Sequence, residues 1–220
     1  MHGYRSAWRG DFGIAMPFYL EQGFNLLVCD QRCHGQSEGR YITYGAHEKY
    51  DCRDWINAAI EKTGPDCEIF LSGMSMGAAT VLLAAGLQLP PQVRGIIADC
   101  GFTCGYDILK NTAKNMVKFT PGFMIDFINF YCRIFAGFDL KEGNTLVAMK
   151  SCQTPILFIH GTHDTFVPCE MTLRNHDTCQ SKKELLIVRG AEHGMSYLIE
   201  EERCKEALKA FIKKHSQISQ

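Results

Sequence analysis

The sequence lacks a charge excess of either sign. Its 23 Lys and Arg residues nearly balance 24 Asp and Glu residues, which gives a formal net charge of −1. No basic stripe and no block of like charge stands out along the chain. Because domains that bind nucleic acid usually carry a concentrated basic surface, we expect no nucleic-acid partner.

The 11 cysteines lack the patterns that would give them a covalent or metal-binding role. Their number is odd, their spacing is irregular, and no C-x-x-C pair occurs. Secreted disulfide scaffolds and structural zinc sites both use regular, paired cysteines. Several cysteines lie inside apolar runs, where a reduced thiol behaves as a small hydrophobe. We therefore expect a reducing cytoplasm and no structural metal.

Long apolar runs are also missing. The most apolar stretch, residues 122–138, is interrupted by Asp126, Asn129 and Arg133. It is shorter than the roughly 20 apolar residues that a helix needs to cross a bilayer. No signal-peptide pattern is visible either. The sequence therefore predicts no membrane span.

What the chain does contain is an alternation of strand-like and helix-like segments. With 220 residues, 46% of them hydrophobic, it is long enough for one sizeable core. Continuous apolar runs, as in strands covered on both faces, predict five buried strands at 24–30, 68–74, 93–100, 155–161 and 184–190. Helical patterns lie between them. This alternation predicts an α/β fold with a doubly wound, mostly parallel sheet.

One interval breaks the alternation. Residues 103–151 are about twice as long as a simple crossover needs, and they are rich in Phe and Met. We interpret them as a helical cap inserted between two core segments, 1–102 and 152–220. Such a cap would cover the carboxyl edge of the sheet, where ligands bind in folds of this kind. The alternative is a long crossover that packs only on the core.

The sharpest motif is G-x-S-x-G, formed by Gly73-Met74-Ser75-Met76-Gly77. It follows a predicted strand and opens a helix of small residues, which is the context of a nucleophile elbow. A side chain at position 73 or 77 would obstruct this tight turn. Ser75 would also lie at a helix N-terminus, whose partial positive charge favours developing negative charge. We expect Ser75 to be a nucleophile.

A serine hydroxyl needs a base, and the base needs an orienting acid. Asp164 follows the fourth predicted strand and His193 follows the fifth. The chain order Ser, Asp, His is the order of α/β-hydrolases. Asp99, at the end of the third strand, is an alternative acid.

We interpret the other polar residues near the strand ends as structural rather than catalytic. His160 and His163 flank the acid loop as turn residues or as neighbours of the acid. We interpret His34 as part of a hydrogen-bonded turn, and Glu192 as a solvated neighbour of the base.

Taken together, these motifs resemble the α/β-hydrolase superfamily, and within it the bacterial esterases and dienelactone-hydrolase-like serine hydrolases. The resemblance rests on "HGYR", on D-x-R-x-H-G-x-S-x-G at 30–39, on "GMSMGA", on "PILFIHGTHDTFVP" and on "GAEHGMSY". It implies that Ser75 attacks a carbonyl, His193 transfers the proton and Asp164 orients the imidazole. A nucleophile elbow donates one oxyanion-hole N–H from the following residue, here Met76. The resemblance places the second donor at the backbone N–H of Tyr4.

The resemblance also implies that strands precede the His-Gly pair, which here stands at residues 2–3. The simplest interpretation is an N-terminally truncated hydrolase. Otherwise the sheet closes the gap by direct pairing, or a partner chain supplies a strand. The chain is accordingly expected to be poorly stable alone or a homo-oligomer.

The predicted function is hydrolysis of small carboxylic esters through an acyl-enzyme. The cap's aromatic and Met residues suggest an apolar pocket for a small-molecule ester. This chemistry requires no metal or organic cofactor. A serine peptidase or a thioesterase is the alternative within the enzyme class, because amides and thioesters use the same groups. A hydrolase-like binding module without activity is the alternative from another class.

Overall fold

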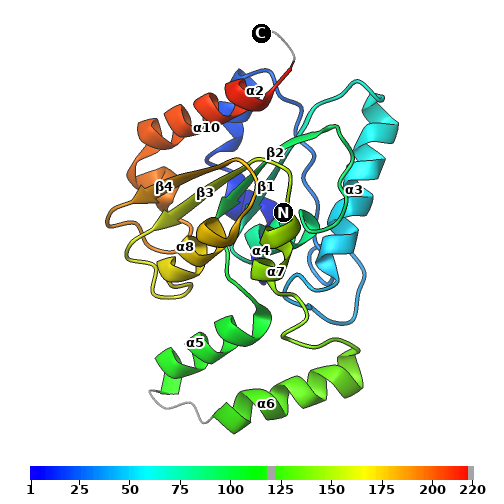
Figure 1. The fold of residues 1–220 in the computed structure, drawn as a ribbon, viewed down its shortest axis with the longest axis vertical. Coiled ribbons are helices and arrows are strands. Elements are labelled where there is room, and N and C mark those ends of the chain that lie inside the picture. Colours follow the sequence, from blue (N-terminus) through cyan, green and yellow to red (C-terminus); the bar gives the residue numbers. More distant parts are fainter. Residues whose placement is uncertain (118–121, 218–220) are drawn as a thin grey trace.

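The computed structural model describes residues 1–117 and 122–217. Within them, one sheet holds β1 (Ile69–Met74), β2 (Val93–Asp99), β3 (Ile156–Gly161) and β4 (Lys183–Val188), in that order across the sheet (Figure 1). Each neighbouring pair is parallel. The carboxyl ends of the strands therefore meet at one edge, which is where the α/β prediction places the site.

Helices cover both faces of the sheet. Their bounds are α1 (Trp8–Phe12), α2 (Met16–Glu21), α3 (Glu48–Thr63), α4 (Met76–Ala84), α5 (Gly105–Val117), α6 (Gly122–Tyr131), the π-helical turn η1 (Cys132–Ala136), α7 (Thr145–Ser151), α8 (Cys169–Thr178), α9 (Ser196–Ile199) and α10 (Glu201–His215). One core cluster joins the sheet to α3, α4 and α7, and a second joins it to α2 and α10.

Successive strand residues point to opposite faces, and both faces are covered. Ile96 belongs to the first core cluster and Ile97 to the second. Likewise, Phe158 belongs to the first cluster and Leu157 to the second. This is why the strands are continuous apolar runs rather than alternating ones. Four of the five predicted strands, and the predicted doubly wound fold class, are thus confirmed.

The prediction of a strand at 24–30 is wrong. These residues form no strand, and the side chains of Leu26, Leu27 and Val28 are exposed. A strand forms only beside a backbone that can hydrogen-bond to it. β1 is the outermost strand of the described sheet, and its outer edge is bonded to Met1, from Met1 N to Ser72 O (2.6 Å) and from Met74 N to Met1 O (3.1 Å). Met1 thus takes part of the edge that a further strand would need, and residues 24–30 pair with no strand of the described sheet.

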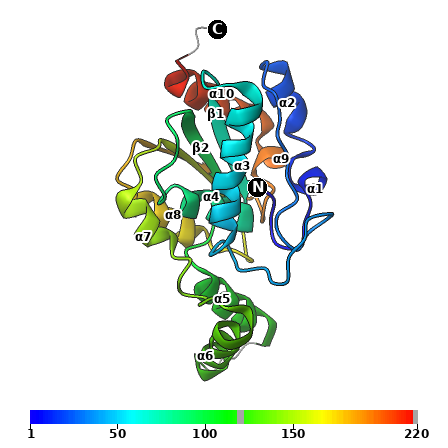
Figure 2. The same ribbon diagram turned by 90° about the vertical axis from the view of Figure 1, so that its right-hand side faces the viewer.

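The interval 103–151 divides into two structural parts. Helices α5 and α6, with η1, project from the body beyond the carboxyl edge of the sheet (Figures 1 and 2). Helix α7, by contrast, contributes Ala148 and Met149 to the first core cluster. The protruding part is thus smaller than the predicted interval. Residues 118–121, between α5 and α6 in the sequence, lie outside the described residues. They include Pro121, and the sequence pattern predicts a break between two helical pieces at Pro121-Gly122.

None of the helices within the described ranges is long and apolar enough to cross a membrane.

Candidate active site

Ser75 lies on a tight turn between β1 and α4. Its backbone has φ 55° and ψ −116°, a conformation that costs energy for any residue with a side chain. Its N–H donates to Asp99 O at 2.9 Å. A Cβ at Gly73 would lie 2.3 Å from Gly77 O, and a Cβ at Gly77 would lie 1.9 Å from Met1 O. The two glycines are therefore required by close backbone approaches, one within the turn and one to the N-terminal loop.

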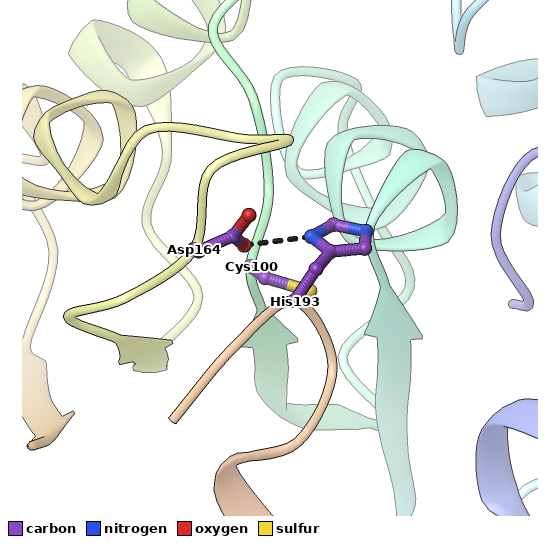
Figure 3. Close-up of side chains that lie close together, drawn as sticks. All are labelled: Cys100, Asp164 and His193. Atoms are coloured by element: carbon purple, nitrogen blue, oxygen red, sulfur yellow. Dashed lines mark hydrogen bonds and ion pairs between the residues drawn. The ribbon is translucent and has the colours of Figure 1, made fainter. Parts of the chain in front are cut away.

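The structure brings the three predicted side chains together from three strand ends. His193 Nε2 lies 2.9 Å from Ser75 Oγ, and His193 Nδ1 lies 2.6 Å from Asp164 Oδ2. Figure 3 shows Asp164 and His193 facing each other, with Cys100 beside them. The imidazole can therefore take a proton from Ser75 at Nε2 while Nδ1–H donates to the carboxylate.

Asp164 is held in its ionised form. Burial acts to raise its pKa, but hydrogen bonds from His160 and His193, the charge of His193 and the N–H of Val167 outweigh burial and lower the pKa to about 2. Its Oδ1 accepts from Phe166 N and Val167 N at 2.9 and 2.8 Å. The carboxylate is thus fixed in place and able to stabilise an imidazolium.

His160 is a direct partner of Asp164. Its Nε2 lies 3.1 Å from Asp164 Oδ2 and 2.9 Å from Val167 O, and its Nδ1 lies 2.7 Å from Thr172 Oγ1. The ring is fully buried. His160 thus lies beside the acid, as predicted. Its hydrogen bond to the Asp164 carboxylate was not predicted from the sequence.

The alternative acid, Asp99, does not contact the ring of His193 through a hydrogen bond. The imidazole Nδ1 bonds to Asp164 instead. Burial raises the pKa of Asp99 to about 6, and its Oδ1 has no hydrogen-bond partner among the described residues. His163 uses its backbone N–H to bond Ala191 O, and Glu192 is exposed.

The two predicted oxyanion donors make no hydrogen bond among the described residues. Within residues 1–117 and 122–217, no acceptor pairs with the backbone N–H of Tyr4 or of Met76. The loop that carries Tyr4 packs on the nucleophile turn, since a Cβ at Gly3 would lie 3.3 Å from Ser75 Cβ. Gly3 N donates to Asp11 Oδ2 at 2.5 Å, a contact for which the sequence carried no signal.

Two buried histidines fix the same loop. Gln31 N donates to His2 Nε2 at 3.0 Å, and Arg5 N donates to His34 Nε2 at 2.9 Å. The two imidazole rings meet edge to face at 4.7 Å. His34 thus shapes a turn, as predicted, and it also ties residues 30–39 to the loop that carries Tyr4.

Helix α5 reaches the acid loop from the protruding part. Asn111 Nδ2 donates to Phe166 O at 3.0 Å, and Asn115 Nδ2 donates to Thr165 O at 2.7 Å. The Phe166 ring lies 5.1 Å from the imidazole of His193. The projecting helices are therefore connected to the loop that holds the base in position.

With this geometry in place, comparison with known proteins identifies the family. The family model Hydrolase_4, serine aminopeptidase S33, matches residues 14–125, about half of the chain. The chain belongs to this family of α/β-hydrolases. The match includes Ser75 and ends before Asp164 and His193.

The chain is also similar to a curated relative and to solved structures. The uncharacterized protein YqkD of Bacillus subtilis is 30% identical over 197 residues, which are 90% of this chain and 65% of YqkD, so the chain spans less than two thirds of that relative. The Pyrococcus furiosus esterase Pf2001 superposes with a TM-score of 0.76 at 23% identity, covering 98% of this chain and 81% of the esterase. A monoacylglycerol lipase from Paleococcus ferrophilus gives 0.70 at 19% identity, covering 98% and 93%. These similarities show the fold.

Proposed function

We propose that this S33-family chain is a serine hydrolase that cleaves small carboxylic esters through an acyl-enzyme. The observation that carries the proposal is the hydrogen-bonded series Ser75–His193–Asp164, with distances of 2.9 and 2.6 Å, on a strained nucleophile turn. The esterase and lipase among the structural neighbours support an ester as the substrate.

The proposed reaction has two halves. His193 Nε2 accepts the proton of Ser75 as Oγ attacks the ester carbonyl, and Asp164 stabilises the imidazolium. The carbonyl oxygen becomes an oxyanion facing the unpaired N–H groups of Met76 and Tyr4. The imidazolium then protonates the leaving alcohol. In the second half, His193 activates water, which attacks the acyl-serine and releases the acid.

A peptidase is the second candidate, because the family model takes its name from a serine aminopeptidase. Amide cleavage would use the same three side chains, with His193 protonating a leaving amine.

We place the reaction in a reducing compartment, the cytoplasm, since all 11 cysteines are free thiols.

The test uses a fluorophosphonate probe, which reacts with activated serines. We expect the intact chain to be labelled and to hydrolyse p-nitrophenyl acetate and butyrate, and Ser75→Ala to do neither. Ser151→Ala, which removes a hydroxyl remote from the site, is the matched control. Alanine p-nitroanilide tests the peptidase. If the folded chain neither reacts with the probe nor cleaves any substrate, it is a binding module and the proposal fails.

A further inference from the structure

We propose that Cys100, Asp164 and His193 form a binding site for a thiophilic divalent cation, best matched by Zn²⁺, which blocks hydrolysis when it binds. The blocking effect rests on the function proposed above. The binding itself does not, because it depends only on the side chains that meet at this edge of the sheet.

The three side chains offer a sulfur, an oxygen and a nitrogen at close range. Their ligand atoms all lie within 4.8 Å of one another, and Figure 3 shows the thiol of Cys100 beside the Asp164–His193 pair. Bonds of about 2.0–2.3 Å in a tetrahedral arrangement hold ligand atoms roughly 3.3–3.7 Å apart. The side chains would thus need to shift by only about an ångström, because they are already near that spacing.

The donor set selects the type of cation. Thiolate and imidazole are ligands of zinc and similar borderline-soft ions, whereas Mg²⁺ and Ca²⁺ prefer oxygen alone. The thiolate and the carboxylate together neutralise a divalent charge. Asp99, the residue preceding Cys100, adds a buried carboxylate with one oxygen that has no hydrogen-bond partner among the described residues. Burial, together with the charges of Asp99 and Asp164, raises the pKa of the Cys100 thiol, so the ion has to displace the thiol proton as it binds. The surroundings therefore favour a cation over a neutral ligand.

The cation reaches the cluster past the imidazole. The side chain of His193 is 29% exposed, while those of Asp164 and Cys100 are buried. The imidazole Nδ1, which faces Asp164, is the ring nitrogen in position to bind the ion. The fourth coordination position remains for water.

Binding at Nδ1 would disable the base without any redox step. The ion takes the place of the proton that Nδ1 shares with Asp164, and the neutral imidazole then carries its proton on Nε2, the atom that faces Ser75. A protonated Nε2 is unable to accept the serine proton. The Cys100 thiol loses its proton to solvent as it binds.

Two measurements on the whole chain test the site. The first is inhibition of ester hydrolysis by Zn²⁺ and its reversal by a chelator, with each variant compared with its own uninhibited rate. We expect Cys100→Ser to require roughly tenfold more Zn²⁺, or more, for half-inhibition. Cys52→Ser, which changes a buried thiol on α3, should respond as the unchanged protein does.

The second measurement is independent of activity. Co²⁺ replaces Zn²⁺ as a spectroscopic probe, because a thiolate bound to it gives a near-ultraviolet charge-transfer band. Unchanged protein, Ser75→Ala and Cys52→Ser should show the band. In Cys100→Ser and His193→Ala, the band should weaken by the intensity that corresponds to one bound Co²⁺ per chain. Circular dichroism checks that both variants are folded. The band also keeps the two proposals apart, since a chain without esterase activity would still show it if the site exists.

Equal bands, or equal sensitivity to Zn²⁺, in the Cys100→Ser and unchanged proteins would overturn the proposal. So would an unchanged protein that binds neither ion, because Cys100 would then be only a small buried hydrophobe. If Cys100→Ser fails to fold, His193→Ala gives the same decision through the cobalt band.

Discussion

Gly77 shows how one missing side chain joins two distant parts of the sequence. The N-terminal loop passes so close to the first turn of α4 that a Cβ at Gly77 would lie 1.9 Å from Met1 O and 2.7 Å from His2 O. The same loop carries the N–H of Tyr4. We therefore expect Gly77 to affect the site through the placement of the proposed oxyanion donor as well as through the serine.

Gly77→Ala should lower kcat/KM strongly. The new methyl group displaces the loop, and loss of one oxyanion donor typically costs about 10²–10³-fold in turnover. Gly122→Ala, where a Cβ meets nothing within 4 Å, is the matched control. Steady-state kinetics on p-nitrophenyl butyrate measure the difference, and a Gly77→Ala protein with normal kcat/KM would show that the loop does not supply a donor.

His160→Leu should destabilise the protein and weaken the base. The substitution leaves Val167 O without this buried partner, and an unsatisfied buried group costs about 1–3 kcal/mol. Thr172 Oγ1 loses its contact with the ring but still donates to Gly101 O. Asp164 also loses one of its donors. Urea denaturation measures the stability, and His160→Gln, which keeps a donor, should be affected less. Equal stability of the Leu and unchanged proteins would contradict this role.

At the residue scale, the sequence placed Ser75, Asp164 and His193 because each follows a strand end. It left Asp99 open as the acid, since the strand next to the nucleophile strand also ends in a carboxylate. Only the folded chain shows that His193 Nδ1 bonds to Asp164. No sequence pattern pointed to a role for Asp11, because its contact with Gly3 N comes from the packing of a short N-terminal helix.

At the scale of elements, segment 24–30 and strand β3 share an apolar pattern and differ in their surroundings. The side chain of Leu27 is 57% exposed, whereas that of Leu157 in β3 is 1% exposed. The pattern alone fails to separate them, because a strand depends on pairing with a neighbouring backbone as well as on its own residues.

A matched pair of substitutions tests this difference. Leu157→Ala should lower the free energy of unfolding by about 2–5 kcal/mol, because it opens a cavity in the core. Leu27→Ala should lower it by less than about 1 kcal/mol, because the side chain already faces solvent. Urea denaturation measures both. Similar losses would mean that residues 24–30 are buried in solution.

Helix α6 exposes most of its apolar side chains. It buries Ile125 and also Asn129, which bonds to Asp139 and to Leu140 N. The exposed apolar residues of α6 and η1 are Phe123, Met124, Phe127, Ile128, Phe130, Tyr131, Ile134 and Phe135. Single exposed apolar residues are ordinary on a monomer, whereas so many on one short segment are uncommon.

Phe127→Gln combined with Phe130→Gln should reduce binding of a hydrophobic dye without lowering the melting temperature, because both rings face solvent. Ile125→Gln on the same helix should lower the melting temperature, since Ile125 is 1% exposed. Dye fluorescence and thermal melting distinguish the two. A double variant that melts earlier would show that the aromatic rings pack against the protein in solution.

At the scale of the whole molecule, the edge of the sheet at β1 has no full partner strand among the described residues. Along the outer edge of β1, Met1 provides the backbone hydrogen bonds among the described residues. Phe24 lies beside this edge, with its ring 6.0 Å from that of Phe70. An edge of this kind, next to exposed apolar residues, favours pairing with another chain.

We therefore expect the chain to associate as its concentration rises. Leu27→Lys combined with Val28→Lys should reduce the association, because charged side chains discourage pairing at an edge. Size-exclusion chromatography with light scattering measures the mass of both proteins. A monomer at every concentration would argue against the predicted homo-oligomer.

The α/β class, four of the strands and the order of the three polar residues could be predicted from the sequence alone. Those properties depend on local periodicity and on residues next to strand ends. Only the tertiary structure decided which carboxylate meets His193, that His160 joins it, and that residues 24–30 remain outside the sheet. These outcomes depend on which backbones and side chains, distant in sequence, come within hydrogen-bonding distance. The energy of such contacts belongs to the pair and is not encoded in either segment alone.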